Sequence, residues 1–211
     1  MQMIYAENIL ICIAVPLLVS LFFVTKSAKR FVGAFLTGMA ICLIGAYIGG
    51  FIDIAAAMPE GETSIFLSPI IEEIIKFLPI LFYMLIFLPG NRDLLLFAVG
   101  IGAGFATFEN CCYILSSGAD SLPYVMIRGL AVGVMHIVCT FVLSMALVLL
   151  RNFKVISFAG IVGALSLSMS FHGLYNLLVS EPGLSSYIGY AMPLLSAVIL
   201  YLPYKRSFKN L

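Results

Sequence analysis

Three ionisable side chains, Glu72, Glu73 and Lys76, lie inside a long apolar run. At membrane depth each such side chain costs at least ~2.5–3.5 kcal/mol on insertion scales, so three within five residues indicate a function. On a helix, Lys76 shares a face with both glutamates, because it follows them by three and four residues. Ser68 and Pro69 could instead begin a helix here, with the glutamates only complementing its dipole. That alternative does not explain Lys76, which lies a turn deeper.

Two later apolar segments carry polar side chains at helical spacing. Phe105, Glu109 and Tyr113 follow one another at intervals of four residues and therefore lie on one helical stripe. His172 and Asn176 also lie four residues apart and share a face. Glu109 alone could instead be a structural acid that is hydrogen-bonded to Tyr113 or Asn110.

Arg128 and His136 lie two turns apart on a further apolar segment. Arg128 could extend its side chain to the outer interface of the membrane. His136 could be a packed, hydrogen-bonded core residue.

The adjacent carboxylates of Glu72 and Glu73 cannot both ionise cheaply in a low dielectric, so we expect one to hold a proton and the other to act as a base. A base that deprotonates water, together with a proton donor for the leaving amine, is sufficient for amide hydrolysis. His172 or Asn176 could donate a hydrogen bond to the developing oxyanion. Lys76 would keep a neighbouring carboxylate charged. No serine lies in a G-x-S-x-G context, so a serine nucleophile is not indicated.

A metal site is the alternative chemistry. Two histidines and two or three glutamates could ligate Zn²⁺, with water in the open position. The chain has no H-E-x-x-H motif, and we expect His136 to lie deeper than the other groups. We therefore expect no cofactor, with zinc as the alternative.

The elements that position these residues are membrane spans. The chain is 63% hydrophobic and only 10% charged, whereas an average soluble domain is roughly 25% charged. Several apolar runs reach the about 20 residues that cross a bilayer. We expect a single all-α domain over residues 1–211, a polytopic transmembrane bundle with the lipid bilayer as its surroundings and no nucleic-acid partner. The seven expected spans are 4–24, 31–52, 66–88, 94–115, 123–150, 156–179 and 184–203.

The charges of the connections predict the orientation. Nine of the eleven basic residues follow spans one, three, five and seven. The positive-inside rule then places the N-terminus outside and the C-terminus in the cytoplasm. In that orientation Glu72, Glu73, Glu109 and His172 all lie roughly 10–12 Å below the outer edge. Because the helices alternate in direction, this common depth predicts one shared site.

Small residues predict how the spans pack. The five cysteines lie in apolar runs without a C-x-x-C pair, so we expect buried thiols rather than a disulfide or zinc framework. Three G-x-x-x-G pairs predict close contact among spans two, four and five. The pairs are Gly45 with Gly49, Gly100 with Gly104, and Gly129 with Gly133.

The polar motifs together resemble a known family. E-E-x-x-K at Glu72–Lys76, then F-x-x-x-E-x-x-x-Y at Phe105–Tyr113, with histidines in two later spans, is similar to the PrsW family of intramembrane proteases. That family is related to the CAAX prenyl endopeptidases and the bacteriocin-immunity membrane proteins, which carry E-E-x-x-x-R. The resemblance covers the central four spans and the overall length. Asn176 stands where the family pattern has aspartate, and an amide cannot act as a base.

The resemblance implies a function and a set of site residues. It implies cleavage of a single-span, anti-sigma-factor-like membrane protein near its extracytoplasmic side, in a bacterial cytoplasmic membrane, as a step of a stress response. The catalytic residues would be Glu72, Glu73 and His172. The supporting residues would be Lys76, Phe105, Glu109, Tyr113, Arg128, His136 and Asn176.

Two other functions remain open from the sequence. Intramembrane acids beside a lysine and histidines also occur in the proton relays of transporters, although the Gly/Pro-interrupted half-spans of many transporters are lacking. A non-catalytic immunity or binding protein could use the same polar cluster to fix the register of its helices.

Overall fold

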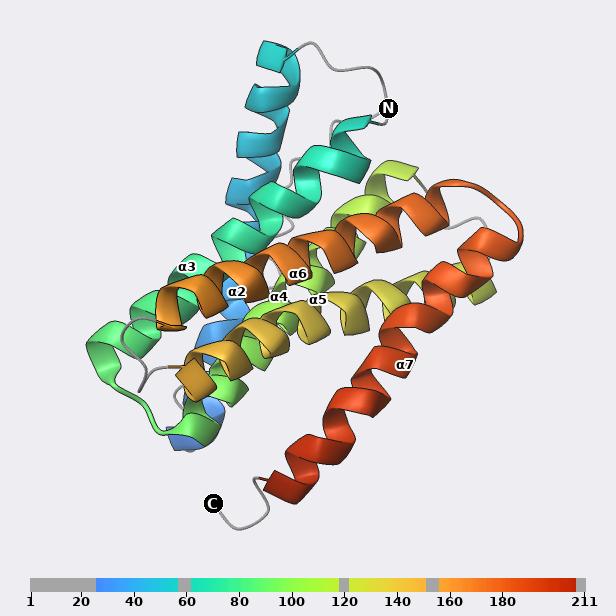
Figure 1. Ribbon diagram of the computed structural model, residues 1–211. Coiled ribbons are helices and arrows are strands. Elements are labelled where there is room, and N and C mark those ends of the chain that lie inside the picture. The colour runs from blue at the N-terminus through green and yellow to red at the C-terminus, as the bar shows by residue number, and fades with distance from the viewer. Residues whose placement is uncertain (1–25, 57–61, 118–121, 151–155, 208–211) are drawn as a thin grey trace.

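A computed structural model of the chain describes residues 26–56, 62–117, 122–150 and 156–207. These residues form long helices joined by short turns and contain no strand, which confirms the all-α prediction (Figure 1). The elements in chain order are α2 (Lys26–Ala56), the π-helical turn η1 (Thr63–Leu67), α3 (Ser68–Phe87), α4 (Asn91–Ser117), α5 (Leu122–Leu150), α6 (Ile156–Ser180) and α7 (Leu184–Ser207).

Within the described part of the chain, five helices are long and apolar enough to cross a membrane, namely α2, α4, α5, α6 and α7. The protein is therefore a multi-pass membrane protein. The helix α3 has 20 residues, including Glu72, Glu73 and Lys76. The first expected span, 4–24, lies outside the described residues, so the count of seven spans and the orientation of the termini stay predictions.

The chain enters α3 through η1 rather than through a capped helix start. The backbone N–H of Ser68 donates to the carbonyl of Thr63, which is the i to i−5 bond of a π turn. Leu67, with no capping side chain, precedes the helix, and Pro69 lies in its first turn. Glu72 and Glu73 lie beyond the first turn, so the helix-dipole explanation does not account for them.

The helix α4 packs between α2 and α5 and contacts both of them. A Cβ atom on Gly104 would overlap the backbone carbonyl of Phe35, and one on Gly100 would crowd Ala34. The second G-x-x-x-G pair therefore makes the close contact that it predicts. The first and third pairs do not, because Gly49, Gly129 and Gly133 have nothing within 4 Å of an added Cβ and Gly45 meets only Ile75 at 3.6 Å.

Two glycines outside these motifs also allow close approach. A Cβ atom added to Gly38 would overlap the backbone of Ile101. A Cβ atom added to Gly102 would lie 2.5 Å from Thr140 Oγ1. Gly102 brings α4 against α5 at His136 itself, because the added Cβ would also lie 2.8 Å from the His136 carbonyl oxygen. The close α4–α5 contact thus holds two site-bearing helices together.

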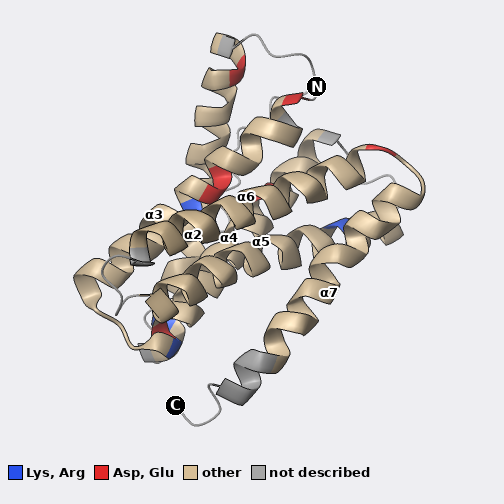
Figure 2. Cartoon of the chain, viewed as in Figure 1, with Lys and Arg blue, Asp and Glu red and all other residues tan. Residues whose placement is uncertain are grey.

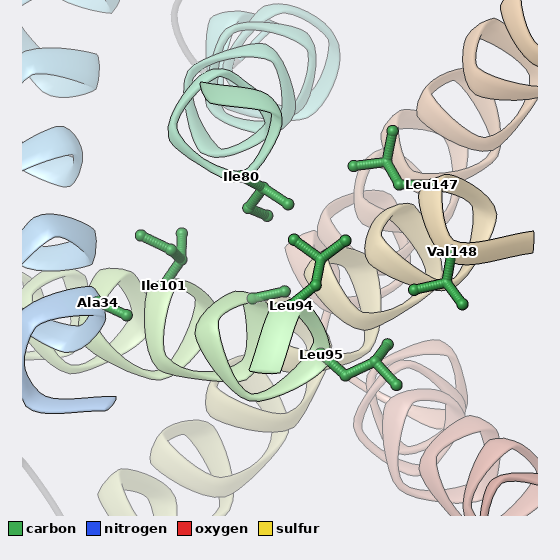
Figure 3. Packing of buried hydrophobic residues seen from close by; sticks show 8 residues of the cluster. Ala34, Ile80, Leu94, Leu95, Ile101, Leu147 and Val148 are labelled. Atoms are coloured by element: carbon green, nitrogen blue, oxygen red, sulfur yellow. The ribbon is translucent and has the colours of Figure 1, made fainter. Parts of the chain in front are cut away.

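Apolar packing fixes the half of the bundle away from η1. A cluster of buried residues joins α2, α3, α4 and α5 (Figure 3). Its members are Ala34, Ile80, Leu94, Leu95, Ala98, Ile101, Leu147 and Val148. The described cysteines are free thiols, of which Cys42 and Cys139 are buried as expected, whereas Cys111 and Cys112 are only partly buried.

Candidate active site

Most ribbon segments of charged residues lie towards helix ends, but a few lie within the bundle where α3 passes the other helices (Figure 2). The interior group comprises Glu72, Glu73 and Lys76 on α3, Glu109 on α4, His136 on α5 and His172 on α6. Their polar atoms form one connected network.

Glu73 is the centre of this network. Its Oε1 accepts a hydrogen bond from Lys76 Nζ at 2.5 Å and another from His172 Nδ1 at 2.8 Å. All three side chains are buried. The contact with Lys76 arises within α3, because the two residues are three apart. The contact with His172 joins α3 to α6, so Glu73 fixes the orientation of the histidine ring.

Lys76 also links α3 to α5. Its Nζ lies 2.7 Å from His136 Nδ1 and 4.8 Å from the centre of the Phe105 ring. An ammonium group carries donors only, so Nδ1 of His136 must accept this bond. The Phe105 face adds a cation–π contact to the buried charge.

His136 continues the network to α4. With Nδ1 as acceptor, its Nε2–H donates to Glu109 Oε2 at 2.5 Å. Glu109 also pairs with Arg128, at 3.9 Å between Nη2 and Oε1. The rings of His136 and His172 meet edge to face, with centroids 5.0 Å apart. The two histidines therefore border one small space.

Glu72 faces this space from α3. Its Oε2 lies 3.9 Å from His172 Nε2 and is buried without a hydrogen-bond partner. One ligand atom each from Glu72, His136 and His172 lies within 4.8 Å of the other two. A single atom between them would lie at most ~2.8 Å from each, which is hydrogen-bond distance for water.

The outer rim of the site is aromatic and basic. The Arg128 guanidinium stacks on the Tyr113 ring at 3.4 Å, and Tyr113 shares a hydrogen bond with Tyr124 at 3.1 Å. Arg128 thus contacts Glu109 and Tyr113, and the hydrogen-bond partner of Glu109 is His136 rather than Tyr113. Tyr124 could not be predicted as part of the site, because nothing in its spacing marks it as a partner of Tyr113.

A model of the PrsW family of intramembrane metalloproteases matches residues 26–203. The chain belongs to the PrsW family. No curated protein and no solved structure matches the chain. Membership in the PrsW family confirms the resemblance seen in the sequence and makes the protein a membrane-embedded peptidase, which sets aside the transporter and immunity-protein alternatives.

The residues present fit the metal that the description of the PrsW family implies. A glutamate with two histidines is the donor set of several catalytic zinc sites. Closing the three donor atoms onto zinc, at about 2.0–2.2 Å, requires movements of less than an ångström from their present spacing. The Oε2 of Glu72 has no hydrogen-bond partner and is available as a ligand. His172 donates its Nδ1–H to Glu73, as a metal-binding histidine commonly does to a supporting carboxylate. The metal-free expectation is therefore not confirmed.

The structure brings together Glu72, Glu73, Glu109 and His172, the four groups expected at one depth. His136 is the correction, because it lies among them instead of deeper. Its depth was inferred from its distance to the helix end. The helix α5 has 29 residues and is about 43 Å long, which exceeds a hydrocarbon core of about 30 Å, so the distance to its end does not give the depth of a residue. Asn176 is half-buried one turn beyond His172 on α6.

Proposed function

We propose that this peptidase is an endopeptidase that hydrolyses a peptide bond within a single-span membrane protein. The observation that carries the proposal is the set formed by partly buried Glu72 with buried His136 and His172, whose ligand atoms lie within 4.8 Å of one another between helices. Ionisable groups are costly at this depth, and their convergence indicates a single use.

Glu72 is the proposed general base. Its Oε2 is the acceptor without a partner that faces His172. As the water oxygen bonds to the scissile carbonyl carbon, Glu72 takes a water proton and then delivers it to the amide nitrogen as the C–N bond breaks. Glu72, His136 and His172 would hold a divalent metal ion, which would supply Lewis-acid polarisation of the carbonyl. As a ligand, Glu72 would offer one carboxylate oxygen and keep the other for the proton.

Glu73 and Lys76 are the proposed positioning residues. Glu73 is committed to Lys76 and to the Nδ1–H of His172, and this bond directs the Nε2 lone pair of His172 towards Glu72. We therefore propose that Glu73 is essential because it orients His172, and that it does not itself act on the substrate. Glu109 with Arg128 would hold His136 from the other side.

The substrate is proposed to be a single-span protein of the anti-sigma-factor type, cut near the extracytoplasmic side of a bacterial cytoplasmic membrane. Glu72 and Glu73 lie near the start of α3, whereas Glu109 and His172 lie near the ends of α4 and α6, so the site is close to one face of the bundle. Acidic Asp53, Glu62 and Glu181 border that face, as expected for the outside. An intact substrate helix hides its carbonyls in hydrogen bonds, so it must unwind locally to be cut.

The test is co-expression with single-span proteins tagged at both ends, with cleavage mapped by mass spectrometry. Wild type is expected to cut within the outer half of the span. Glu72→Gln is expected to lose at least about 100-fold in rate, the usual scale for a general base. The matched control is Glu62→Gln at an exposed acid, which should cut normally. Normal cleavage by folded Glu72→Gln protein would rule out the proposed mechanism.

A further inference from the structure

Both ring nitrogens of His136 are already engaged within the protein. A neutral imidazole offers one lone pair and one N–H. The lone pair at Nδ1 accepts from Lys76 at 2.7 Å, and the N–H at Nε2 donates to Glu109 at 2.5 Å. His136 therefore has no lone pair to give to a metal ion in this arrangement.

The other two members of the set are ready for a ligand. His172 donates its Nδ1–H to Glu73 and leaves the Nε2 lone pair free on the side of Glu72. Glu72 Oε2 is buried without a partner. If Lys76 released the Nδ1 lone pair of His136, all three residues would have a donor atom available for a metal ion.

Lys76 also supplies the positive charge that a metal ion would bring. Glu72, Glu73 and Glu109 converge with only Lys76 and Arg128 as nearby cations among the described residues. An ammonium group beside a divalent cation would be repelled in a low dielectric. The two cations therefore compete for the same place.

We propose that Lys76 is an internal counter-cation that holds the metal-free site together and must release His136 before a metal ion binds. The inference rests on the metal donor set of the proposed function. Release does not require a break with Glu73, because Glu73 Oε2 is buried without a partner and can accept the ammonium as it turns. The flexible stem of a lysine permits this movement. Lys76 thus sets the metal affinity of the site.

The experiment is a Co²⁺ titration of chelator-stripped, detergent-purified full-length protein, followed by the visible absorption of the bound ion. Lys76→Met is expected to bind Co²⁺ about tenfold or more tightly than wild type, because it removes a competing charged hydrogen bond. Lys29→Met is the matched control, since Lys29 is an exposed lysine outside the site. It should change the affinity less than about threefold, within the effect of an exposed charge.

A charge-balanced comparison covers the case in which Lys76→Met does not fold. The double variant Glu73→Gln/Lys76→Met should bind Co²⁺ more tightly than Glu73→Gln alone. Adding His136→Ala should remove the gain. Equal affinities with and without Lys76, or an equal gain in Lys29→Met, would overturn the inference while leaving the donor set in place. Absence of Co²⁺ binding in wild type and in every variant would overturn the donor set and the inference together.

Discussion

Replacing Lys76 with methionine should strongly destabilise the metal-free protein. Lys76 and Glu73 are fully buried and 2.5 Å apart. Removing one partner of a buried ion pair leaves an uncompensated charge and typically costs about 3–5 kcal/mol. Lys76 also donates to His136 and lies over Phe105, so the loss is expected at the upper end of that range.

The second variant, Glu73→Gln/Lys76→Met, removes both charges and nearly preserves the side-chain volumes. Replacing a buried pair with neutral groups is often close to neutral, so the double variant should recover most of the loss. The exposed Lys29 provides the matched control, and Lys29→Met should change stability by less than about 0.5 kcal/mol.

Stability would be measured by unfolding in mixed micelles with a chelator present, followed by helical circular dichroism. The chelator matters because a bound metal ion would replace the missing charge of Lys76. If Lys76→Met is within about 1 kcal/mol of wild type, the buried ion pair does not have the assigned role. A double variant as unstable as Lys76→Met would lead to the same conclusion.

Three further predictions concern packing, metal and substrate. Gly104→Ala should cost about 1–3 kcal/mol by overpacking against Phe35, whereas Gly133→Ala, with nothing within 4 Å, should be nearly neutral in the same unfolding measurement. Treatment with a zinc chelator should stop cleavage in proteoliposomes and added Zn²⁺ should restore it; cleavage that continues would favour the metal-free mechanism. Helix-weakening glycines near the cut should speed cleavage of a test substrate in gel assays, and leucines there should slow it; equal rates would count against local unwinding.

Much of the site follows from periodicity in the sequence. The helical spacing of Glu72, Glu73 and Lys76, and the alternating direction of the helices, were sufficient to predict that these acids meet Glu109 and His172. These are properties of single helices and of their order in the chain.

The other features of the site depend on how the helices are placed relative to one another and on which helix faces pack together. His136 lies in the site through its contacts with Lys76 and Glu109. The helix α5 is longer than a hydrocarbon core, so position along it does not give depth. Gly38 and Gly102 are contact points and Gly129 is not, because a glycine matters only where another backbone lies against it. The three donor atoms come from three helices, and their distances cannot be derived from a linear sequence.

The central claim is that Glu72 and His172, from different helices, act as one catalytic unit. The most direct test measures single-turnover cleavage in proteoliposomes by Glu72→Gln, His172→Gln and the double variant. Residues that act together show non-additive losses. Each single variant should lose at least about 100-fold, and the double variant should be no slower than the slower single one. Losses that multiply, or a folded single variant that cuts at the wild-type rate, would contradict the claim.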